Sequence, residues 1–284
     1  MIDSIQQTVS NRSESVSSGP IATDSDSRHV NWFKRQGWAI ASIFGGLALW
    51  EFVARVIVGS KLFLAAPTQV LIAFVGLVFS GELEKHIFVS ASEFALGYAA
   101  ASVLGILLGL AMATSRAAKQ ALQPWVSGFY ATPTVALAPL FILWFGIGIF
   151  SKVVVVVVLV IFPVAINTEA GLRTTSEQLI ETVRSFGATS RQVFFKVSLP
   201  SALPFIFAGL KLGIGRGLIG VVVAELFGAR AGLGELISES AETFNMPNLF
   251  AGVTLLAVAG IAMTSGFTWL ERHLLPWRDD DERH

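Results

Sequence analysis

Apolar segments long enough to cross a lipid bilayer recur along most of this 284-residue chain, separated by short polar stretches. An α-helix needs about 20 predominantly apolar residues to cross the hydrocarbon core. Six segments reach that length, namely residues 38–58, 88–114, 121–149, 150–171, 203–228 and 249–270. The hydropathy pattern therefore predicts an all-α membrane protein with about six transmembrane helices.

The third segment belongs to an uncharged run between Lys119 and Lys152 that is too long for one straight span. As a single helix it would measure ~48 Å, whereas the hydrocarbon core is about 30 Å thick. Pro124, Pro133 and Pro139 lie inside it. Because a proline in a helix interior removes a backbone hydrogen bond, we expect an entry at the membrane interface followed by a kinked third span.

The fourth segment opens with the run KVVVVVVLVIFP, which starts at Lys152 and would suggest a buried strand in a soluble protein. Beside five other long apolar segments, a helix is the better interpretation. An open strand edge in lipid would leave backbone groups without hydrogen-bond partners. The run is therefore predicted to be a membrane helix.

Composition supports a membrane location and removes several other classes. The chain is 53% hydrophobic and 14% charged, with a mean hydropathy of +0.66, far too apolar for a soluble globular domain. Its formal net charge is zero, so no overall basic field indicates a nucleic-acid partner. Cysteine is absent and the four histidines lie outside the apolar segments. These facts exclude disulfides and a cysteine nucleophile and argue against a buried histidine metal centre.

The lysines and arginines predict the orientation. With the N-terminus in the cytoplasm, twelve that lie near the apolar segments fall inside, namely Arg28, Lys34, Arg35, Arg116, Lys119, Arg173, Arg184, Arg191, Lys196, Arg272, Arg278 and Arg283. Four fall outside, namely Lys61, Lys85, Lys152 and Arg230. Cytoplasmic loops carry the excess of positive charge, so both termini are predicted to be cytoplasmic.

The ends of the chain differ from its apolar core. Residues 1–35 are rich in Ser, Asp and Gln without apolar periodicity, which predicts a disordered cytoplasmic tail. The first span, residues 36–61, follows this long polar leader and exceeds the apolar part of a signal peptide, so we expect it to remain as an anchor. Residues 62–276 are the predicted membrane core, and residues 277–284 are a polar cytoplasmic tail.

A polar, basic stretch interrupts the apolar pattern before the fifth segment, on the predicted cytoplasmic side. In TSEQLIETVRSFG the apolar residues recur at helical spacing, Ser176 can cap the start, and Gly187 is placed to end the helix. A second helical piece, TSRQVFFKVSL, is expected to begin at a Thr189 or Ser190 cap and to stop at Pro200.

This stretch has a plain explanation and a functional one. A basic loop would satisfy the positive-inside bias without any further role. Two amphipathic helices that meet at a glycine, however, carry apolar side chains that such a loop would not need. We therefore expect this element to dock into a groove on another protein.

Its spacing resembles a known motif. Glu181, then Gly187 six residues later, then VSLP with Val197, Leu199 and Pro200, resemble the cytoplasmic EAA loop of permease subunits in binding-protein-dependent ABC importers. The sequence departs from that pattern at Thr182 and Val183, where the family usually has two alanines.

Other segments extend the resemblance to about residues 62–276. PLFILWFGIGIFSK (139–152), FPVAINTEAGLR (162–173) and GLKLGIGRGLIGVVVAELFGARAGLGELI (209–237) resemble the branch of the family that handles sulfonates, taurine, nitrate and similar small compounds. The resemblance implies a type I ABC importer-like permease fold and a small organic or inorganic anion as substrate.

The resemblance also implies an assembly in the bacterial inner membrane. It would contain a second permease copy, most simply as a homodimer, two cytoplasmic ATPase subunits and a periplasmic or lipid-anchored solute-binding protein. The chain has no G-x-x-x-x-G-K-[ST] loop, so it is not expected to be an enzyme or to hold a cofactor, and ATP and Mg belong to the partner ATPase. The residues implied to couple to that ATPase are Glu181, Thr182, Val183, Arg184, Gly187, Val197, Leu199 and Pro200.

Polar groups within the spans are candidates for the translocation path, because intramembrane charge is costly. Arg216 could face the cavity and attract an anion, or it could hold a helix contact through backbone carbonyls. Thr132, Thr134 and Asn167 could line the path or bond a neighbouring carbonyl. We expect Glu225 near the outer mouth, where solvent or a gate partner satisfies it.

Two further features of this part of the chain carry alternatives. Glycines 209, 213 and 217 form overlapping G-x-x-x-G units, which favour close helix packing and could also form the dimer seam. A short external helix is predicted at 233–243. Its acidic residues Glu235, Glu239 and Glu242 form either a solvated face or a docking surface for the binding protein.

Two other functional classes compete with the importer. A secondary transporter driven by an ion gradient would show internal hydropathy repeats and coupling carboxylates near the midplane. No convincing repeat is present, and Glu93 and Glu225 are predicted near span ends. An intramembrane enzyme would need a buried nucleophile with a base, or a metal cluster, yet histidine and cysteine are absent from the predicted spans.

Overall fold

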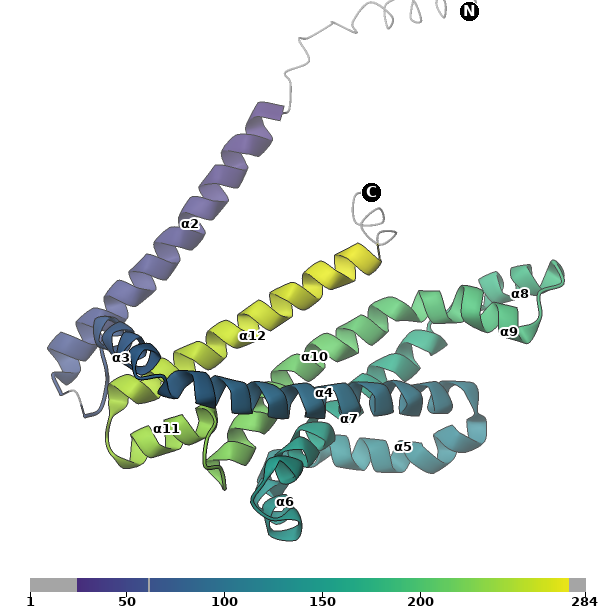
Figure 1. Ribbon diagram of the computed structural model, residues 1–284. Helices are drawn as coiled ribbons and strands as arrows, with labels where there is room; N and C mark the ends of the chain where they lie inside the picture. Colours follow the sequence, from purple (N-terminus) through teal and green to yellow (C-terminus); the bar gives the residue numbers. More distant parts are fainter. Residues whose placement is uncertain (1–24, 61, 276–284) are drawn as a thin grey trace, which may run out of the picture. The chain divides into compact units, whose positions relative to one another are not determined.

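The computed structural model describes residues 25–60 and 62–275, and the regular structure of these residues is helical. The α-helices are α2 (Ser25–Phe52), α3 (Pro67–Phe79), α4 (Glu82–Thr114), α5 (Arg116–Ala131), α6 (Ala138–Phe145), α7 (Ile149–Arg173), α8 (Glu177–Ser185), α9 (Ser190–Val193), α10 (Leu199–Leu226), α11 (Leu233–Glu242) and α12 (Met246–Leu274) (Figure 1). Three short turns are 3-10 or π-helical, namely η1 (Val53–Val58), η2 (Thr134–Leu137) and η3 (Phe194–Ser198). The prediction of an all-α protein is confirmed.

The chain divides into two compact units, Met1–Phe52 and Val53–His284. The described part of the first unit is helix α2, whose side chains are mostly exposed from Gly37 onward. The apolar run Ile40–Val58 is long enough to cross a membrane, in agreement with the first predicted span.

The predicted tails fall largely on residues that the structure does not describe. Residues 1–24 and 276–284 lie outside the described residues, so disorder there stays a prediction. Helix α2 begins at Ser25, inside the segment predicted as a tail. The sequence from Ser25 to Gln36 contains no glycine or proline, so it offers no residue that would end the helix before the apolar run.

Among the described residues, five helical segments are long and apolar enough to cross a membrane. Besides Ile40–Val58 they are Glu82–Thr114, Ile149–Arg173, Ser190–Leu226 and Met246–Leu274. The pair α5 and η2–α6 would make a sixth if it forms one bent span. The prediction of about six spans is therefore confirmed, and the valine-rich run is helical in α7.

The expected kink in the long uncharged run occurs at Pro133. Helix α5 ends at Ala131, and α5 and the following helical segment are bent by 86°. Thr132 is extended, with ψ 137°, as expected for a residue before a proline. Pro124 lies inside α5 without ending it, and Pro139 lies in the first turn of α6.

Helix α7 is the centre of the second unit, between α4 and α10, and makes its most extensive contacts with these two helices (Figure 1). Its valines 155, 156, 160 and 164 are almost fully buried. Glycines on both neighbouring helices face α7 or its surroundings, namely Gly97, Gly105, Gly109, Gly209, Gly213, Gly217 and Gly220. A Cβ on Gly209 would lie 2.8 Å from the Cβ of Asn167. The predicted G-x-x-x-G stripe is thus used for close packing inside the subunit.

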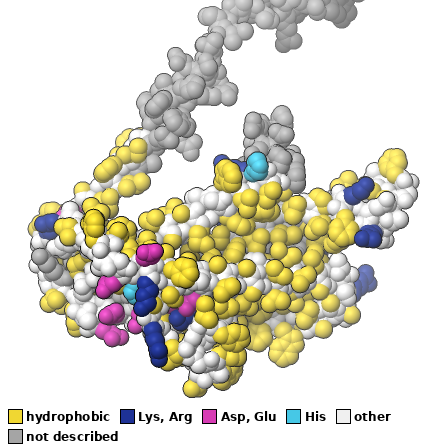
Figure 2. Space-filling model, viewed as in Figure 1, with side chains coloured by type: hydrophobic (Ala, Val, Ile, Leu, Met, Phe, Trp, Pro, Cys, Tyr) yellow, Lys and Arg dark blue, Asp and Glu magenta, His cyan; other side chains and the backbone are white. Residues whose placement is uncertain are grey.

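Charged and apolar side chains separate along the second unit (Figure 2). Hydrophobic side chains cover the middle of the visible face, while charged side chains of both signs gather near α11 at one end and lysines and arginines lie near α8 and α9 at the other. The exposed apolar residues include Leu104 and Leu107 on α4 and Ile261 on α12. This distribution fits a bundle whose middle lies in lipid and whose two ends meet water.

The two ends carry different short helices (Figure 1). Helices α8 and α9 form a hairpin at one end, and α3 and α11 lie at the other. Helix α3 begins at Pro67 and has 13 residues, too few to cross a membrane, and it had not been predicted. Helix α11 (Leu233–Glu242) confirms the short helix predicted at 233–243.

Candidate functional site

The α8–α9 hairpin extends beyond the bundle and exposes apolar side chains (Figure 1). Helix α8 has no buried residue. The Phe186 ring after it is 88% exposed, and Leu179 on α8 is 46% exposed. Glu181 and Arg184 are also exposed. An apolar ring almost fully in water at the tip of a short polar hairpin is a surface that another protein would cover.

The turn between the two helices is set by Gly187. Its φ of +84° lies in the left-handed region that favours glycine. The Gly187 amide donates to the Arg184 carbonyl at 2.8 Å, and the Ala188 amide donates to the Val183 carbonyl at 3.3 Å. These bonds close the end of α8, as the sequence predicted.

The caps of the two helices differ. Thr189 caps α9 in a capping box with Gln192, as predicted: its hydroxyl accepts from the Gln192 amide at 3.3 Å, and its own amide donates to Gln192 Oε1 at 2.8 Å. Ser176 occupies the cap position of α8, but its side chain makes no cap hydrogen bond. The hairpin is therefore fixed more firmly on the α9 side.

The prediction that the second helical piece stops at Pro200 is wrong. Pro200 lies in the first turn of α10, and the chain is helical from Ser190 to Leu226 through the π-helical turn η3. A proline in the first turn of a helix lacks only an N–H that would have no intrahelical partner, and a π turn changes the hydrogen-bond spacing just before it. The hairpin is consequently continuous with a transmembrane helix.

The predicted path residues Thr132 and Asn167 bond nearby backbone carbonyls. Thr132 donates to the Gly128 carbonyl, and the side-chain amide of Asn167 donates to the Pro163 carbonyl, each at 2.8 Å. Thr134 is buried at the start of η2. The structure therefore satisfies the Thr132 and Asn167 donors locally and does not bring these residues together in one cluster.

Arg216 lies on the side of α10 away from its buried glycines. Gly213 and Gly217 are buried, whereas Arg216 is exposed. The guanidinium carbon lies 5.0 Å from the centre of the Tyr130 ring of α5, and one guanidinium nitrogen lies 3.4 Å from the Tyr130 hydroxyl. This contact includes a cation–π interaction with a side chain, and not the carbonyl contacts that the sequence left open.

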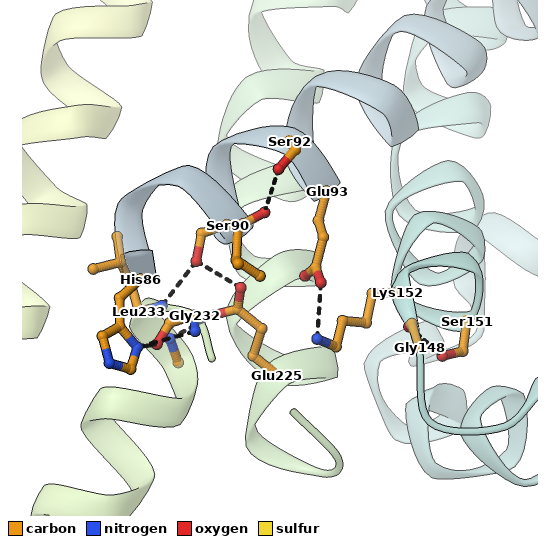
Figure 3. A network of polar contacts seen from close by, with 12 residues as sticks. His86, Ser90, Ser92, Glu93, Gly148, Ser151, Lys152, Glu225, Gly232 and Leu233 are labelled. Atoms are coloured by element: carbon orange, nitrogen blue, oxygen red, sulfur yellow. Dashed lines mark hydrogen bonds and ion pairs between the residues drawn. The ribbon is translucent and has the colours of Figure 1, made fainter. Parts of the chain in front are cut away.

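A buried ion pair joins α4 and α7, and sequence reasoning missed it (Figure 3). Lys152 Nζ lies 2.8 Å from Glu93 Oε1, and their side chains are 6% and 2% exposed. The sequence placed Glu93 near a span end and Lys152 among external charges. In the structure the two meet inside the bundle, because α4 and α7 pack closely along their length.

Glu225 was predicted to reach solvent or a gate partner, and that prediction is wrong. Glu225 is fully buried. The Ser90 hydroxyl donates to Glu225 Oε1 at 2.5 Å, and the Gly234 amide donates to Glu225 Oε2 at 2.6 Å. The α10–α11 connection folds back over the carboxylate, so fixed protein donors replace water around it.

His86 belongs to the same region, although the histidines were placed outside the apolar segments. It lies in α4, and its Nδ1 is 3.0 Å from the Gly232 amide nitrogen and 2.7 Å from the Gly232 carbonyl oxygen (Figure 3). The tautomer decides which of the two contacts is the hydrogen bond.

A second charged cluster lies toward the hairpin end of the bundle. Glu169 on α7 is buried and lies 2.7 Å from Lys119 Nζ on α5, with Arg173 at 3.5 Å. The charge at Glu169 within an apolar segment was the one sequence signal for this pair. An intramembrane carboxylate requires a cation partner, and Lys119 was the nearest lysine before the third segment.

The comparison with protein families gives one clear match. A family model described as "Binding-protein-dependent transport system inner membrane component" matches residues 101–279. That range runs from the second half of α4 to the end of α12 and includes the α8–α9 hairpin.

Curated relatives cover most of the chain. It is 37% identical to the formylaminopyrimidine transport permease protein ThiX of Halalkalibacterium halodurans, over 82% of this chain and 92% of that protein. It is 35% identical to the putative aliphatic sulfonates transport permease protein SsuC of Bacillus subtilis, over 88% and 91%. It is 33% identical to the taurine transport system permease protein TauC of Escherichia coli, over 82% and 87%.

Solved structures share the fold at lower identity. A chain of an amino acid ABC transporter crystallised with histidines has a TM-score of 0.56 and 17% identity, covering 72% of this chain and 97% of that one. A chain of the MetNI methionine ABC transporter has a TM-score of 0.54 and 20% identity, covering 68% and 94%. At these identities the likeness concerns the fold.

Proposed function

This chain belongs to the family of binding-protein-dependent transport system inner membrane components and is a permease of ABC importers for small solutes, and from that premise we propose that it works as a homodimer driven by separate ATPase subunits. Its fold is the type I importer fold that the sequence predicted. The proposed partners are two cytoplasmic ATPases, which hold ATP and Mg, and a periplasmic or lipid-anchored binding protein.

The observation that carries this proposal is the exposed hairpin continuous with α10. Phe186 and Leu179 present apolar surface at its end, and the chain stays helical from Ser190 through α10. A groove on the ATPase that held this apolar tip would move α10 with it, because a helix transmits displacement where a flexible loop would absorb it. Glu181 and Arg184 are exposed and would pair with charges beside that groove.

The positive-inside bias supports an orientation with both termini in the cytoplasm. The α8–α9 hairpin then faces the cytoplasm, where the ATPase subunits would be. Helix α11 faces the outside, where a binding protein would deliver the solute.

We propose a small anion, such as a sulfonate or nitrate, as substrate. Two relatives are named for aliphatic sulfonates and taurine, while others are named for formylaminopyrimidine and riboflavin. Within this chain the support is Arg216, an exposed cation in the membrane-spanning part of α10. Because a charge facing lipid is costly, we assign this face of α10, with Tyr130, to the path between the two permease copies. Thr132, Thr134 and Asn167 remain weaker path candidates.

The test uses the permease purified with its partner ATPase and reconstituted with the binding protein and a panel of anions. Gly187→Pro and Glu181→Lys should insert in the membrane yet lose stimulation of ATP hydrolysis. Unchanged transport in both variants would remove the coupling role. Uptake driven by an ion gradient without any ATPase would instead support a secondary transporter.

The chain offers a matched control for the glycine variant. Gly81, at the opposite end of the bundle, has φ +76°, and its amide donates to the Val78 carbonyl, as Gly187 donates to Arg184. Neither glycine has an atom within 4 Å of an added Cβ. Gly81→Pro therefore introduces the same local strain and lost hydrogen bond, and it should retain the stimulated activity that Gly187→Pro loses.

A further inference from the structure

The first turn of α11 is held by side chains from two transmembrane helices (Figure 3). The Leu233 amide donates to Ser90 Oγ of α4 at 2.8 Å, and the Gly234 amide donates to Glu225 Oε2 of α10 at 2.6 Å. His86 Nδ1 holds the preceding residue, Gly232. We call His86, Ser90 and Glu225 the α11 socket. It satisfies backbone groups that otherwise have no partner at a helix start.

The first turn of α11 packs so closely on the socket that no side chain fits at Gly232 or Gly234. A Cβ on Gly232, whose φ is +137°, would lie 2.3 Å from the Glu225 carboxyl carbon. A Cβ on Gly234 would lie 2.7 Å from the Val222 carbonyl oxygen and 2.8 Å from the Glu225 Cβ. The backbone of the first α11 turn therefore rests directly on the Glu225 side chain, and any added atom would lift it away.

The socket also connects the outer ends of two spans, α4 and α10, and a neighbouring ion pair adds α7. The Ser90 hydroxyl accepts from Leu233 and donates to Glu225, so it joins α11, α4 and α10 at one atom. One turn further along α4, Glu93 pairs with Lys152 of α7. Packed and hydrogen-bonded interiors shift between discrete arrangements and resist gradual deformation. The outer ends of α4, α7 and α10 and the start of α11 therefore move as one piece, unless the hydrogen bonds and the ion pair between them break.

One face of helix α11 packs against the bundle, and the opposite face is exposed to solvent. Leu233, Leu236 and Ser240 are buried against the bundle, while Glu239 and Glu242 are exposed. Of the elements at the end opposite the hairpin, α11 is thus both accessible and bonded to α4 and α10.

We propose that the α11 socket is the rigid connection through which a solute-binding protein, docked on the exposed face of α11, moves α4 and α10. The inference rests on the proposed importer function. His86, Ser90 and Glu225 act as positioning residues: they touch neither solute nor nucleotide, and they keep α11 and the outer ends of the spans in one body throughout the cycle.

Ser90 provides a matched pair of variants. Ser90→Ala removes both hydrogen bonds of the hydroxyl and leaves the Leu233 amide without its acceptor. Ser90→Thr keeps the hydroxyl, and its extra methyl has room because Ser90 lines an apolar cavity of about 540 Å³ between α4, α10 and α12. A difference between the two variants therefore reports the hydrogen bonds and not the change in volume.

The experiment measures basal and binding-protein-stimulated ATP hydrolysis, and affinity for the binding protein, in the intact reconstituted complex. Ser90→Ala should keep assembly, basal hydrolysis and affinity but lose stimulation by about tenfold, the scale of one or two lost buried hydrogen bonds. Ser90→Thr should restore it. Normal stimulation in Ser90→Ala, equal loss in both variants, or a parallel loss of basal hydrolysis would each overturn the proposal.

A second measurement does not depend on the variants. Hydrogen exchange at the Leu233 and Gly234 amides of the wild-type complex should stay slow with and without bound binding protein and ATP, because the socket remains closed. Rapid exchange in either state would show that the socket opens, and it would overturn a rigid connection. If the wild-type complex is not stimulated by any binding protein, the proposed function fails first, and that result is distinguishable from failure of the socket.

Discussion

The buried Glu93–Lys152 pair gives the sharpest energetic prediction. At the observed 2.8 Å between Lys152 Nζ and Glu93 Oε1, the Coulomb attraction is about 6 kcal/mol at an effective dielectric constant of about 20. Desolvation costs several kcal/mol for each ion, so the net contribution of the intact pair is small. Removing one partner leaves the other charge buried without a counter-ion. The free energy of unfolding then falls by about 3–5 kcal/mol.

The two single variants should not be equal. Glu225 is close enough to interact electrostatically with both Glu93 and Lys152. Lys152→Met would leave two neighbouring carboxylates without a cation, and we expect a loss near 5 kcal/mol. Glu93→Gln would leave Lys152 with Glu225, and we expect a loss near 3 kcal/mol. A double variant with Lys152→Met and Glu93→Leu replaces the pair by apolar groups of similar size and should lie within about 1–2 kcal/mol of wild type.

The assay is reversible unfolding in mixed micelles, followed by the fluorescence of the seven tryptophans. The reasoning fails if Lys152→Met costs less than about 1 kcal/mol, the value for an exposed pair. It also fails if the double variant is as unstable as Lys152→Met, or if Glu93→Gln is the worse of the single variants.

Three further predictions concern packing, coupling and pH. Gly109→Ala places a Cβ 2.5 Å from the Ala165 carbonyl oxygen and should cost about 1–3 kcal/mol, whereas Gly128→Ala, with no atom within 4 Å, should be neutral or stabilising; equal unfolding temperatures would contradict the packing. Phe186→Ser should weaken co-purification with the ATPase without lowering the unfolding temperature, because the ring is 88% exposed; a parallel fall in both would indicate a folding role. Burial, followed by two acidic neighbours on α11, raises the pKa of Glu235 above 4.5. Just above pH 4.5 the folded protein therefore binds a proton at Glu235 that the unfolded chain does not, so the free energy of unfolding falls as pH rises through this range. Glu235→Gln should make the free energy of unfolding depend less on pH there. An unchanged pH dependence would refute the raised pKa of Glu235.

The membrane character, the number of spans and the α8–α9 hairpin were predictable from the sequence. Whether a segment spans the membrane depends on its length and polarity. In lipid, a long apolar segment must form a helix, because only then do its backbone groups all find hydrogen-bond partners within the segment. The Gly187 turn and the Thr189 cap are equally local. Element boundaries were less secure, as Pro200 shows, since a π turn allowed the helix to continue where a proline was expected to stop it.

The tertiary structure alone decided which polar groups meet. Glu93 and Lys152 are 59 residues apart, Ser90 and Glu225 are 135 apart, and His86 and Gly232 are 146 apart. In the sequence these residues lie at or just beyond the ends of apolar segments, and nothing local indicates which of them meet. Close packing of α4 and α10 on α7, made possible by their glycines, buries these groups together. Each buried polar group then needs a hydrogen-bond or charged partner. The sequence thus determined the helices and their location in a membrane. The packing of helices far apart in the chain determined the α11 socket, the Glu93–Lys152 ion pair and the face of α10 that carries Arg216.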